Sequence, residues 1–175
     1  KTIKPNTKVY QASSSEMFGN NIDDDGYQRE TTPLSPVSPY GCAKVFSYNI
    51  CRNYRNSYGM FISNGILFNH ESPRRGSNFV WMILQQEEPD DFVCATGISH
   101  SVKDLVEYVF GRLDLEWQKY IKVDEKYFRP EELKDLKGDS TKAREVLGWD
   151  PKYTFETMMD EMIQHWLNHY DNKTI

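Results

Sequence analysis

Two short apolar segments separated by a long helical pattern constrain the fold of this chain more than any other feature. Residues 8–13 (KVYQAS) and 61–68 (FISNGILF) have the composition of buried strands. Between them, the segment from Pro39 to about Tyr58 has apolar side chains at helical spacing, with proline in the first turn and Gly59 at its end. A strand, a long helix and a second strand predict a parallel β-α-β unit within an open α/β sheet.

The rest of the chain adds one more strand, several helices and polar loops. We predict a surface loop at 20–38, a strand in the segment FVCATG, and helices at 81–86, 101–113, 139–147 and 155–170. Residues 119–138 begin with a strand-like pattern and then form a loop. The acidic turn at 87–91 (EEPDD) is most simply a solvated loop, and we assign it no function.

The composition is that of a globular protein whose main partner is neither nucleic acid nor a membrane. The net charge is −5, and the sequence has no run of basic residues. The three cysteines, Cys42, Cys51 and Cys94, lack metal-type spacing, so we expect neither a disulfide framework nor a structural zinc site. Since the sequence has neither a long apolar run nor a signal-peptide pattern, we predict a cytoplasmic location.

Four side chains that can hold or move protons come from two neighbouring predicted elements. Ser14 and Glu16 follow the first strand, and Tyr40 and Lys44 lie four residues apart on one face of the predicted helix. An ammonium close to a phenol favours the phenolate, which can act as a base, and Glu16 adds a second proton site. The alternative is that Tyr40 only packs and Lys44 only covers a helix face, because an isolated Tyr-x-x-x-Lys is common by chance.

A second group of candidates follows the second predicted strand. Arg74 and Arg75 can bind phosphate oxygens through their planar guanidinium groups, or they are ordinary surface arginines. His70, in the same loop, is equally compatible with a ligand contact and with a satisfied loop histidine. His165 and His169 share a helix face without a third ligand in view, so we predict no metal site.

Several segments together resemble one family, the extended short-chain dehydrogenases/reductases that act on nucleotide sugars, and most closely its GDP-mannose 4,6-dehydratase branch. SPYGCAK and GDSTKA mark the broad superfamily, whereas NHESPRRG and YFRPEE are specific to the GDP-mannose branch. The resemblance covers most of the chain. It implies a partial Rossmann-like doubly wound parallel sheet with a smaller mixed C-terminal domain, divided into 1–98 for NADP binding and 99–175 mostly for binding the GDP-sugar.

The resemblance also implies roles for individual residues. The family's catalytic positions fall on Ser14, Glu16, Tyr40 and Lys44, with serine at 14 where the dehydratases usually have threonine. The implied contacts with NADP are Tyr40, Lys44, Leu67, Asn69, His70 and Arg75. The implied contacts with the substrate are Ser14, Glu16, Asn69, Asn78, Arg129 and Glu131.

The implied reaction converts GDP-mannose to GDP-4-keto-6-deoxymannose, with loss of water and internal hydride transfer through NADP. The first alternative is a nucleotide-sugar epimerase or 4-keto reductase on the same scaffold, which needs tyrosine and lysine but no base at C5. The second alternative is a non-catalytic remnant that binds a partner. The resemblance further implies a homodimer or a homotetramer.

The sequence departs from the family pattern in three places. The family begins with a glycine-rich segment that binds the dinucleotide pyrophosphate, and this chain has no GxGxxG. An apparent gap follows Val80, where NFV runs directly into Trp81, and a smaller one falls around Tyr120. We expect either a truncated gene product, which would fail to hold NADP, or the ordered stretches of a longer protein. The abrupt position of the breaks favours the latter.

Overall fold

The structure is a computed structural model that describes residues 4, 6–70, 78–128 and 131–171. These residues form two compact units. The first unit contains the described residues up to His70, then those of 77–98, and finally Glu131–Asp150. The second unit contains the described parts of Ser99–Pro130 and Pro151–Ile175. The chain therefore returns to the first unit after leaving it, and the functional division at residue 98 stays a prediction.

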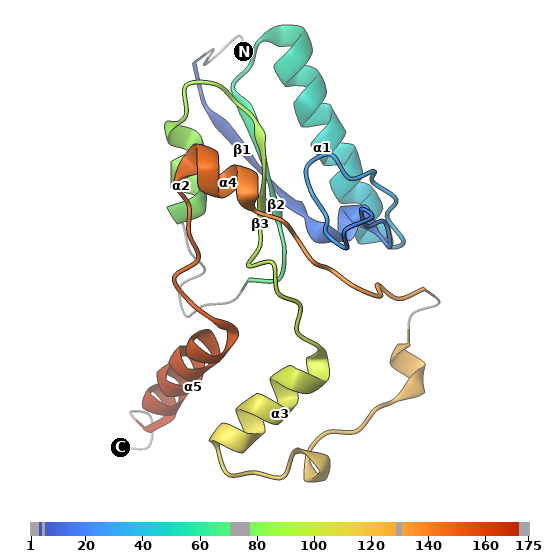
Figure 1. Ribbon diagram of the computed structural model, residues 1–175, viewed down its shortest axis with the longest axis vertical. Helices are drawn as coiled ribbons and strands as arrows, with labels where there is room; N and C mark the ends of the chain where they lie inside the picture. The colour runs from blue at the N-terminus through green and yellow to red at the C-terminus, as the bar shows by residue number, and fades with distance from the viewer. Residues whose placement is uncertain (1–3, 5, 71–77, 129–130, 172–175) are drawn as a thin grey trace. The chain divides into compact units, whose positions relative to one another are not determined.

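The first unit is built on a three-stranded parallel sheet with helices on both faces (Figure 1). Its strands are β1 (Val9–Ser14), β2 (Ile62–Leu67) and β3 (Asp91–Cys94), in the order β1-β2-β3. Helix α1 (Pro39–Tyr58) covers one face, and α2 (Asn78–Gln85) and α4 (Thr141–Leu147) cover the other. The predicted α/β fold with a parallel sheet is confirmed.

Helix α1 begins and ends where its sequence predicts. The Ser38 hydroxyl accepts a hydrogen bond from the backbone N–H of Gly41, so it caps the first turn, and Pro39 occupies the position that needs no N–H partner. At the other end, Gly59 adopts the left-handed conformation with φ of 58° and donates its N–H to the carbonyl of Arg55. Both ends are therefore fixed by local chemistry.

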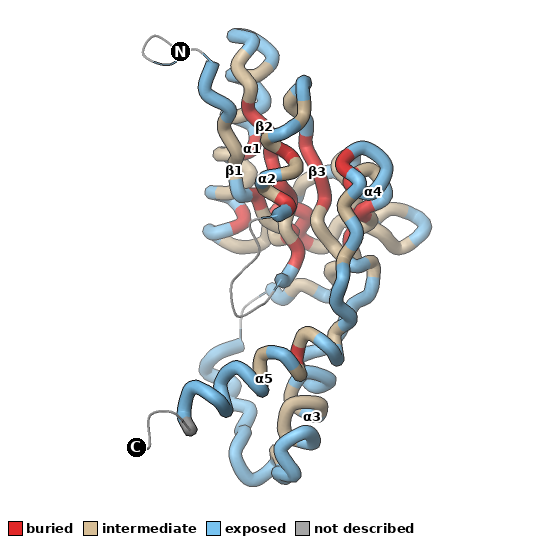
Figure 2. The backbone as a smooth tube through the Cα atoms, turned by 90° about the vertical axis from the view of Figure 1, so that its left-hand side faces the viewer, coloured by how far each residue is buried: buried red, intermediate tan, exposed pale blue. Residues whose placement is uncertain are grey.

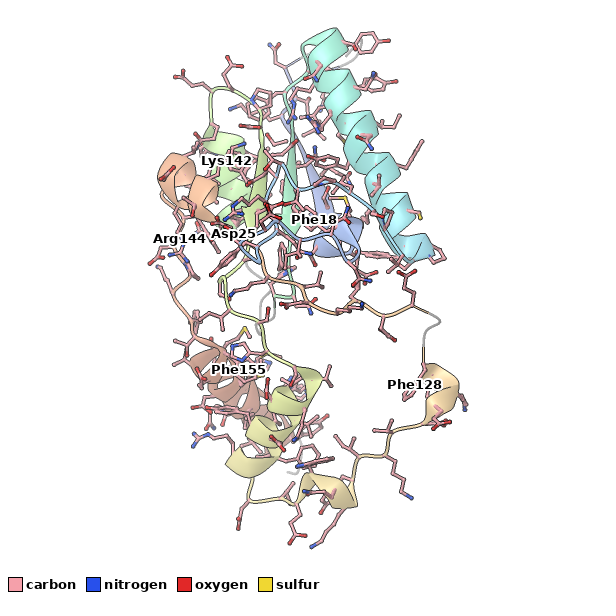
Figure 3. All side chains as sticks on the ribbon, turned by 45° about the vertical axis from the view of Figure 1, so that its right-hand side comes forward. Phe18, Asp25, Phe128, Lys142, Arg144 and Phe155 are labelled. Carbon is pink, nitrogen blue, oxygen red and sulfur yellow. The ribbon has the colours of Figure 1, made fainter. Side chains whose placement is uncertain are left out.

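Each face of the sheet has its own apolar core. The core under α1 contains Met17 and Phe18 with Tyr48, Ile66, Phe68 and Val93. The core under α2 and α4 contains Phe79, Ile83, Phe92, Ala143 and Leu147. Figure 2 shows many buried residues along the strands of this unit, and Figure 3 labels Phe18 beside the sheet. Burial of apolar surface on both faces stabilises the sheet that carries the candidate site.

The second unit consists of α3 (Val102–Arg112), η2 (Trp117–Lys119), η3 (Glu125–Tyr127) and α5 (Phe155–Asp171). The predicted capping box at the start of α3 is confirmed, because Ser101 and Asp104 each bond the other's backbone N–H. Helices α3 and α5 are joined by the Tyr108 hydroxyl, which donates to an Asp160 oxygen at 3.0 Å. The strand-like start predicted for 119–138 is wrong: residues 119–124 lie outside any strand and are exposed, and the backbone N–H groups of 119–121 bond to the carbonyls of Glu116 and Trp117.

The prediction of a solvated acidic loop at 87–91 is wrong for its last residue. Asp91 is the first residue of β3, and only 6% of its side chain is exposed. Arg55 at the end of α1 binds both carboxylate oxygens, at 2.8 and 3.0 Å, and the Asn64 amide donates to one of them at 2.8 Å. Burial alone would raise the pKa of Asp91, but these hydrogen bonds outweigh it and lower the pKa.

Candidate functional site

The candidate site begins at the carboxyl end of β1, where the chain turns into the short helix η1 (Ser15–Phe18). Ser14 is the last residue of β1, and its hydroxyl accepts a hydrogen bond from the backbone N–H of Glu16 at 3.2 Å. Gly19 closes the turn with φ of 59° and donates its N–H to the carbonyl of Glu16. A side chain at Gly19 would place Cβ only 1.8 Å from the carbonyl oxygen of Ser35, so this turn requires glycine.

The carboxylate of Glu16 is tied to the start of α1. Its Oε2 accepts a hydrogen bond from the Ser38 hydroxyl at 2.8 Å, and that hydroxyl accepts from the backbone N–H of Gly41 at 2.9 Å. The approach is close, because Cβ at position 41 would lie 2.9 Å from the carbonyl oxygen of Glu16. Turn η1 and the first turn of α1 are therefore packed backbone against backbone.

Tyr40 and Lys44 lie on this same end of α1. The Lys44 ammonium is 5.5 Å from the centre of the Tyr40 ring, as expected for residues one helical turn apart. It also donates to the carbonyl oxygen of Ala12 in β1, at 2.7 Å. Tyr40 is 53% exposed, so this residue is open to solvent at the start of α1.

The end of β2 lies beside the end of β1. In the parallel register Ser14 is opposite Leu67, and Leu67 is opposite Cys94 in β3. Asn69 and His70 follow directly and are exposed, and His70 Nδ1 lies 2.9 Å from the carbonyl oxygen of Phe68. Ligands of open α/β sheets bind at this carboxyl edge.

The remaining predicted site residues are only partly covered by the structure. Asn78 is exposed at the first residue of α2, and Glu131 is exposed at the start of the segment that rejoins the first unit. Arg75 and Arg129 lie outside the described residues. Ser14, Glu16, Tyr40 and Lys44 are thus brought to one end of β1 and α1, together with Leu67, Asn69 and His70.

Two residues of this region escaped the sequence analysis. Ser38 was predictable as a helix cap from its place before Pro39, but no local signal pairs it with Glu16. Asn20 follows η1 and contacts the backbone of the segment after residue 130: its amide donates to the Glu132 carbonyl at 3.3 Å and accepts from the Lys134 N–H at 2.9 Å. This segment continues from Glu131, so Asn20 joins the turn of Glu16 to the neighbourhood of a predicted substrate contact.

The chemistry available at this edge is proton transfer. Hydroxyl, carboxylate, phenol and ammonium groups come from β1, η1 and α1, and this set suits removal and return of protons on a small polyol. Among the described residues no cluster of histidine, cysteine or carboxylate side chains could hold a metal ion. In the same part of the chain no helix is long and apolar enough to cross a bilayer.

A family model described as GDP-mannose 4,6 dehydratase matches residues 1–80 and 78–162 of this chain. Relatives with high similarity include GDP-mannose 4,6 dehydratase 1 of Arabidopsis thaliana, 41% identical over 196 aligned positions, and GDP-mannose 4,6 dehydratase of Homo sapiens, 38% identical over 213. Each match covers 89% of this chain, but only 54% and 57% of the respective relative. The chain spans little more than half the length of these relatives.

The alignments also show that the relatives contain additional residues within the matched region. The aligned positions outnumber the 175 residues of the whole chain in both cases. The two segments matched by the family model meet at residues 78–80, next to the gap predicted after Val80.

Solved structures with the same fold include a dTDP-glucose 4,6-dehydratase from Bacillus anthracis in complex with NAD. It has a TM-score of 0.83 and 19% identity, over 97% of this chain and 65% of that one. A Thermus thermophilus UDP-glucose 4-epimerase in complex with NAD gives a TM-score of 0.78 at 17% identity, over 91% of this chain and 64% of that one. At these identities the likeness establishes the fold alone.

Proposed function

Because the chain belongs to the GDP-mannose 4,6-dehydratase family, we propose that the protein dehydrates GDP-mannose to GDP-4-keto-6-deoxymannose and is a lyase. The observation that carries this proposal is the contact between the Glu16 carboxylate and Ser38, at 2.8 Å. It holds an acidic side chain at the start of the helix that bears Tyr40 and Lys44. A redox reaction alone needs the tyrosine and the lysine, whereas elimination of water also needs a base for the C5 proton.

We propose NADP as the cofactor, and the donor set at the carboxyl edge fits a nicotinamide nucleotide. An ammonium has three donors, so Lys44 can donate to Ala12 and still bind ribose hydroxyls. Leu67 ends β2, and Asn69 and His70 come after it at the edge where open α/β sheets bind dinucleotides; Arg75 belongs to the same proposed set. When bound, the cofactor supplies a hydride acceptor and donor for the sugar.

Each catalytic side chain then has a separate task. Tyr40 takes the proton from the O4 hydroxyl, and the Lys44 ammonium stabilises the negative charge on the phenol oxygen. The ketone formed at C4 acidifies the hydrogen at C5. Glu16 removes that proton and assists departure of the C6 hydroxyl as water, and Ser14 binds the oxygen at C4. The hydride then returns to C6, and Tyr40 or Glu16 returns a proton to the sugar, which gives the 4-keto-6-deoxy product.

The nucleotide end of the substrate is assigned to Arg129 and Glu131, and Asn69 and Asn78 complete the proposed substrate contacts. Asn20 supports the assignment of Glu131, because its side chain bonds the backbone on both sides of Leu133, close to Glu131. We further propose a homodimer or homotetramer located in the cytoplasm.

The proposal is tested by incubating the purified protein with GDP-mannose and NADP+. The expected product is a 4-keto nucleotide sugar lighter by one water. Glu16→Gln should abolish water loss yet still reduce the nicotinamide transiently, whereas Tyr40→Phe should abolish both. Matched controls are Glu87→Gln in the exposed acidic turn and Tyr54→Phe on the exposed face of α1, which should leave turnover unchanged.

Three results would contradict the proposal in different ways. Full turnover by the Glu16→Gln variant would show that this carboxylate is not the base that removes the C5 proton. Epimerised or reduced sugar without water loss would favour the epimerase or 4-keto reductase alternative. A purified protein that binds NADP+ and GDP-mannose but releases no new sugar would favour a non-catalytic binding protein.

A further inference from the structure

The Ser38 hydroxyl connects two parts of the site that come from different elements. It lies between the Glu16 carboxylate of η1 and the first turn of α1, with contacts of 2.8 and 2.9 Å. We propose that Ser38 is a positioning residue, which holds the carboxylate of Glu16 in the orientation needed to take the C5 proton. The catalytic part of this inference rests on the proposed function.

The direction of both hydrogen bonds follows from the chemistry of the groups. The backbone N–H of Gly41 can only donate, so a lone pair of the Ser38 oxygen accepts this hydrogen bond. An ionised carboxylate can only accept, so the single Ser38 proton must point to Oε2 of Glu16. The cap thereby orients the hydroxyl proton, and the proton orients the carboxylate.

The backbone of Glu16 is fixed independently of its side chain. Its N–H donates to the Ser14 hydroxyl, and its carbonyl accepts from the Gly19 N–H. With the backbone held, the hydrogen bond to Oε2 restrains the side-chain torsions of Glu16 and so the orientation of its carboxylate.

The link also couples the two proton-transfer groups. Ser38 is two residues before Tyr40, and both belong to the beginning of α1. A displacement of α1 would move the phenol and, through Ser38, the carboxylate together. Loss of the link should misplace Glu16 relative to Tyr40, and a misplacement of about 1 Å can slow a reaction by roughly a hundredfold.

A set of substitutions separates this role from simple helix capping. Ser38→Thr keeps both the cap and the donated proton. Ser38→Asp keeps the cap, because aspartate is as good a cap as serine, but it has no proton to donate when ionised. Ser38→Ala removes both.

The first experiment measures the contact without any need for turnover. Ser38→Ala and Glu16→Ala are made singly and together, and the urea midpoint of unfolding is measured for all four proteins. Ser38→Ala should lower the midpoint more in the parent protein than in the Glu16→Ala background, where only the cap remains to be lost. Equal shifts in the two backgrounds would overturn the proposal, whether or not the protein is active.

The second experiment follows reduced nicotinamide during turnover of GDP-mannose. With Ser38→Asp the first hydride transfer should stay near the parent rate while water loss slows by roughly tenfold to a hundredfold, so reduced nicotinamide accumulates. Ser38→Thr should behave as the parent. A purely structural role would slow both steps together and show no accumulation. If the parent protein forms no product while the unfolding cycle shows coupling, the proposed function fails and the link between Ser38 and Glu16 stands.

Discussion

Asp91 offers the most direct test of how helix α1 is held against the sheet. Its carboxylate joins three elements, because it starts β3 and binds Arg55 of α1 and Asn64 of β2. The exposed fractions of the Asp91 and Arg55 side chains are 6% and 13%, so water cannot easily replace either partner. We predict that Asp91→Asn strongly destabilises the protein, since it leaves the Arg55 charge without its counter-ion.

The expected loss of unfolding free energy follows from the cost of removing one partner of a buried ion pair. That cost is about 3–5 kcal/mol. Two features favour the lower end of this range. Arg55 keeps a hydrogen bond to the carbonyl oxygen of Ile62 at 3.1 Å, and asparagine retains one acceptor oxygen. We therefore expect a decrease of about 3 kcal/mol in the free energy of unfolding.

The measurement is urea denaturation of the parent and of two variants. Arg52→Gln is the matched control: Arg52 Nε also faces Asp91, at 3.6 Å, but 49% of its side chain is exposed. Its loss should cost less than about 1 kcal/mol. An Asp91→Asn protein no less stable than Arg52→Gln would refute the view that this buried pair holds α1 to the sheet.

Three further predictions concern acid stability and two surface turns. Because the pKa of Asp91 is lowered in the folded protein, its contribution to the free energy of unfolding is fully present above the ordinary carboxyl pKa of about 3.9 and is lost as the pH falls below that value. Asp91→Asn should therefore make the free energy of unfolding less dependent on pH in acid. Gly19→Ala should destabilise the protein by at least about 1–3 kcal/mol in thermal unfolding, because it adds backbone strain and a clash with Ser35. Arg29→Met should speed hydrogen exchange at the amide of Asp139, since Arg29 contacts that residue's carboxylate at 2.8 Å and the amide donates to Gln28. An unchanged pH dependence, melting temperature or exchange rate would contradict these predictions in turn.

The elements that sequence predicted well are those whose limits are set by neighbouring residues. Helix α1 begins after Ser38 and ends before Gly59, and both signals are contained in the residues that form its ends. The capping box of α3 is equally local, with Ser101 and Asp104 three residues apart. The same local signals place Glu16 after the end of a strand and Tyr40 in the first turn of a helix, whereas their catalytic roles stay predictions.

Features that depend on distant contacts were not predictable in the same way. Asp91 belongs to an acidic run, and nothing in that run distinguishes it from its solvated neighbours. Its burial is decided by Arg55 and Asn64, which lie 36 and 27 residues away in sequence. The link between Ser38 and Glu16 spans 22 residues and exists only because α1 packs back on η1. Residues 119–124 show the opposite error, since strand-like composition yields no strand without a partner.

Helix α2 shows why the apparent gap after Val80 is compatible with a folded helix. Val80 and Trp81 are consecutive residues of α2, although the two matched segments of the family model meet at residues 78–80. Phe79 and Ile83 lie four residues apart across this junction, so they share one face of the helix, and both are buried against the sheet. Trp81 is 60% exposed. Because the core requires only apolar side chains at helical spacing, two segments that the family model matches separately can form one amphipathic turn here.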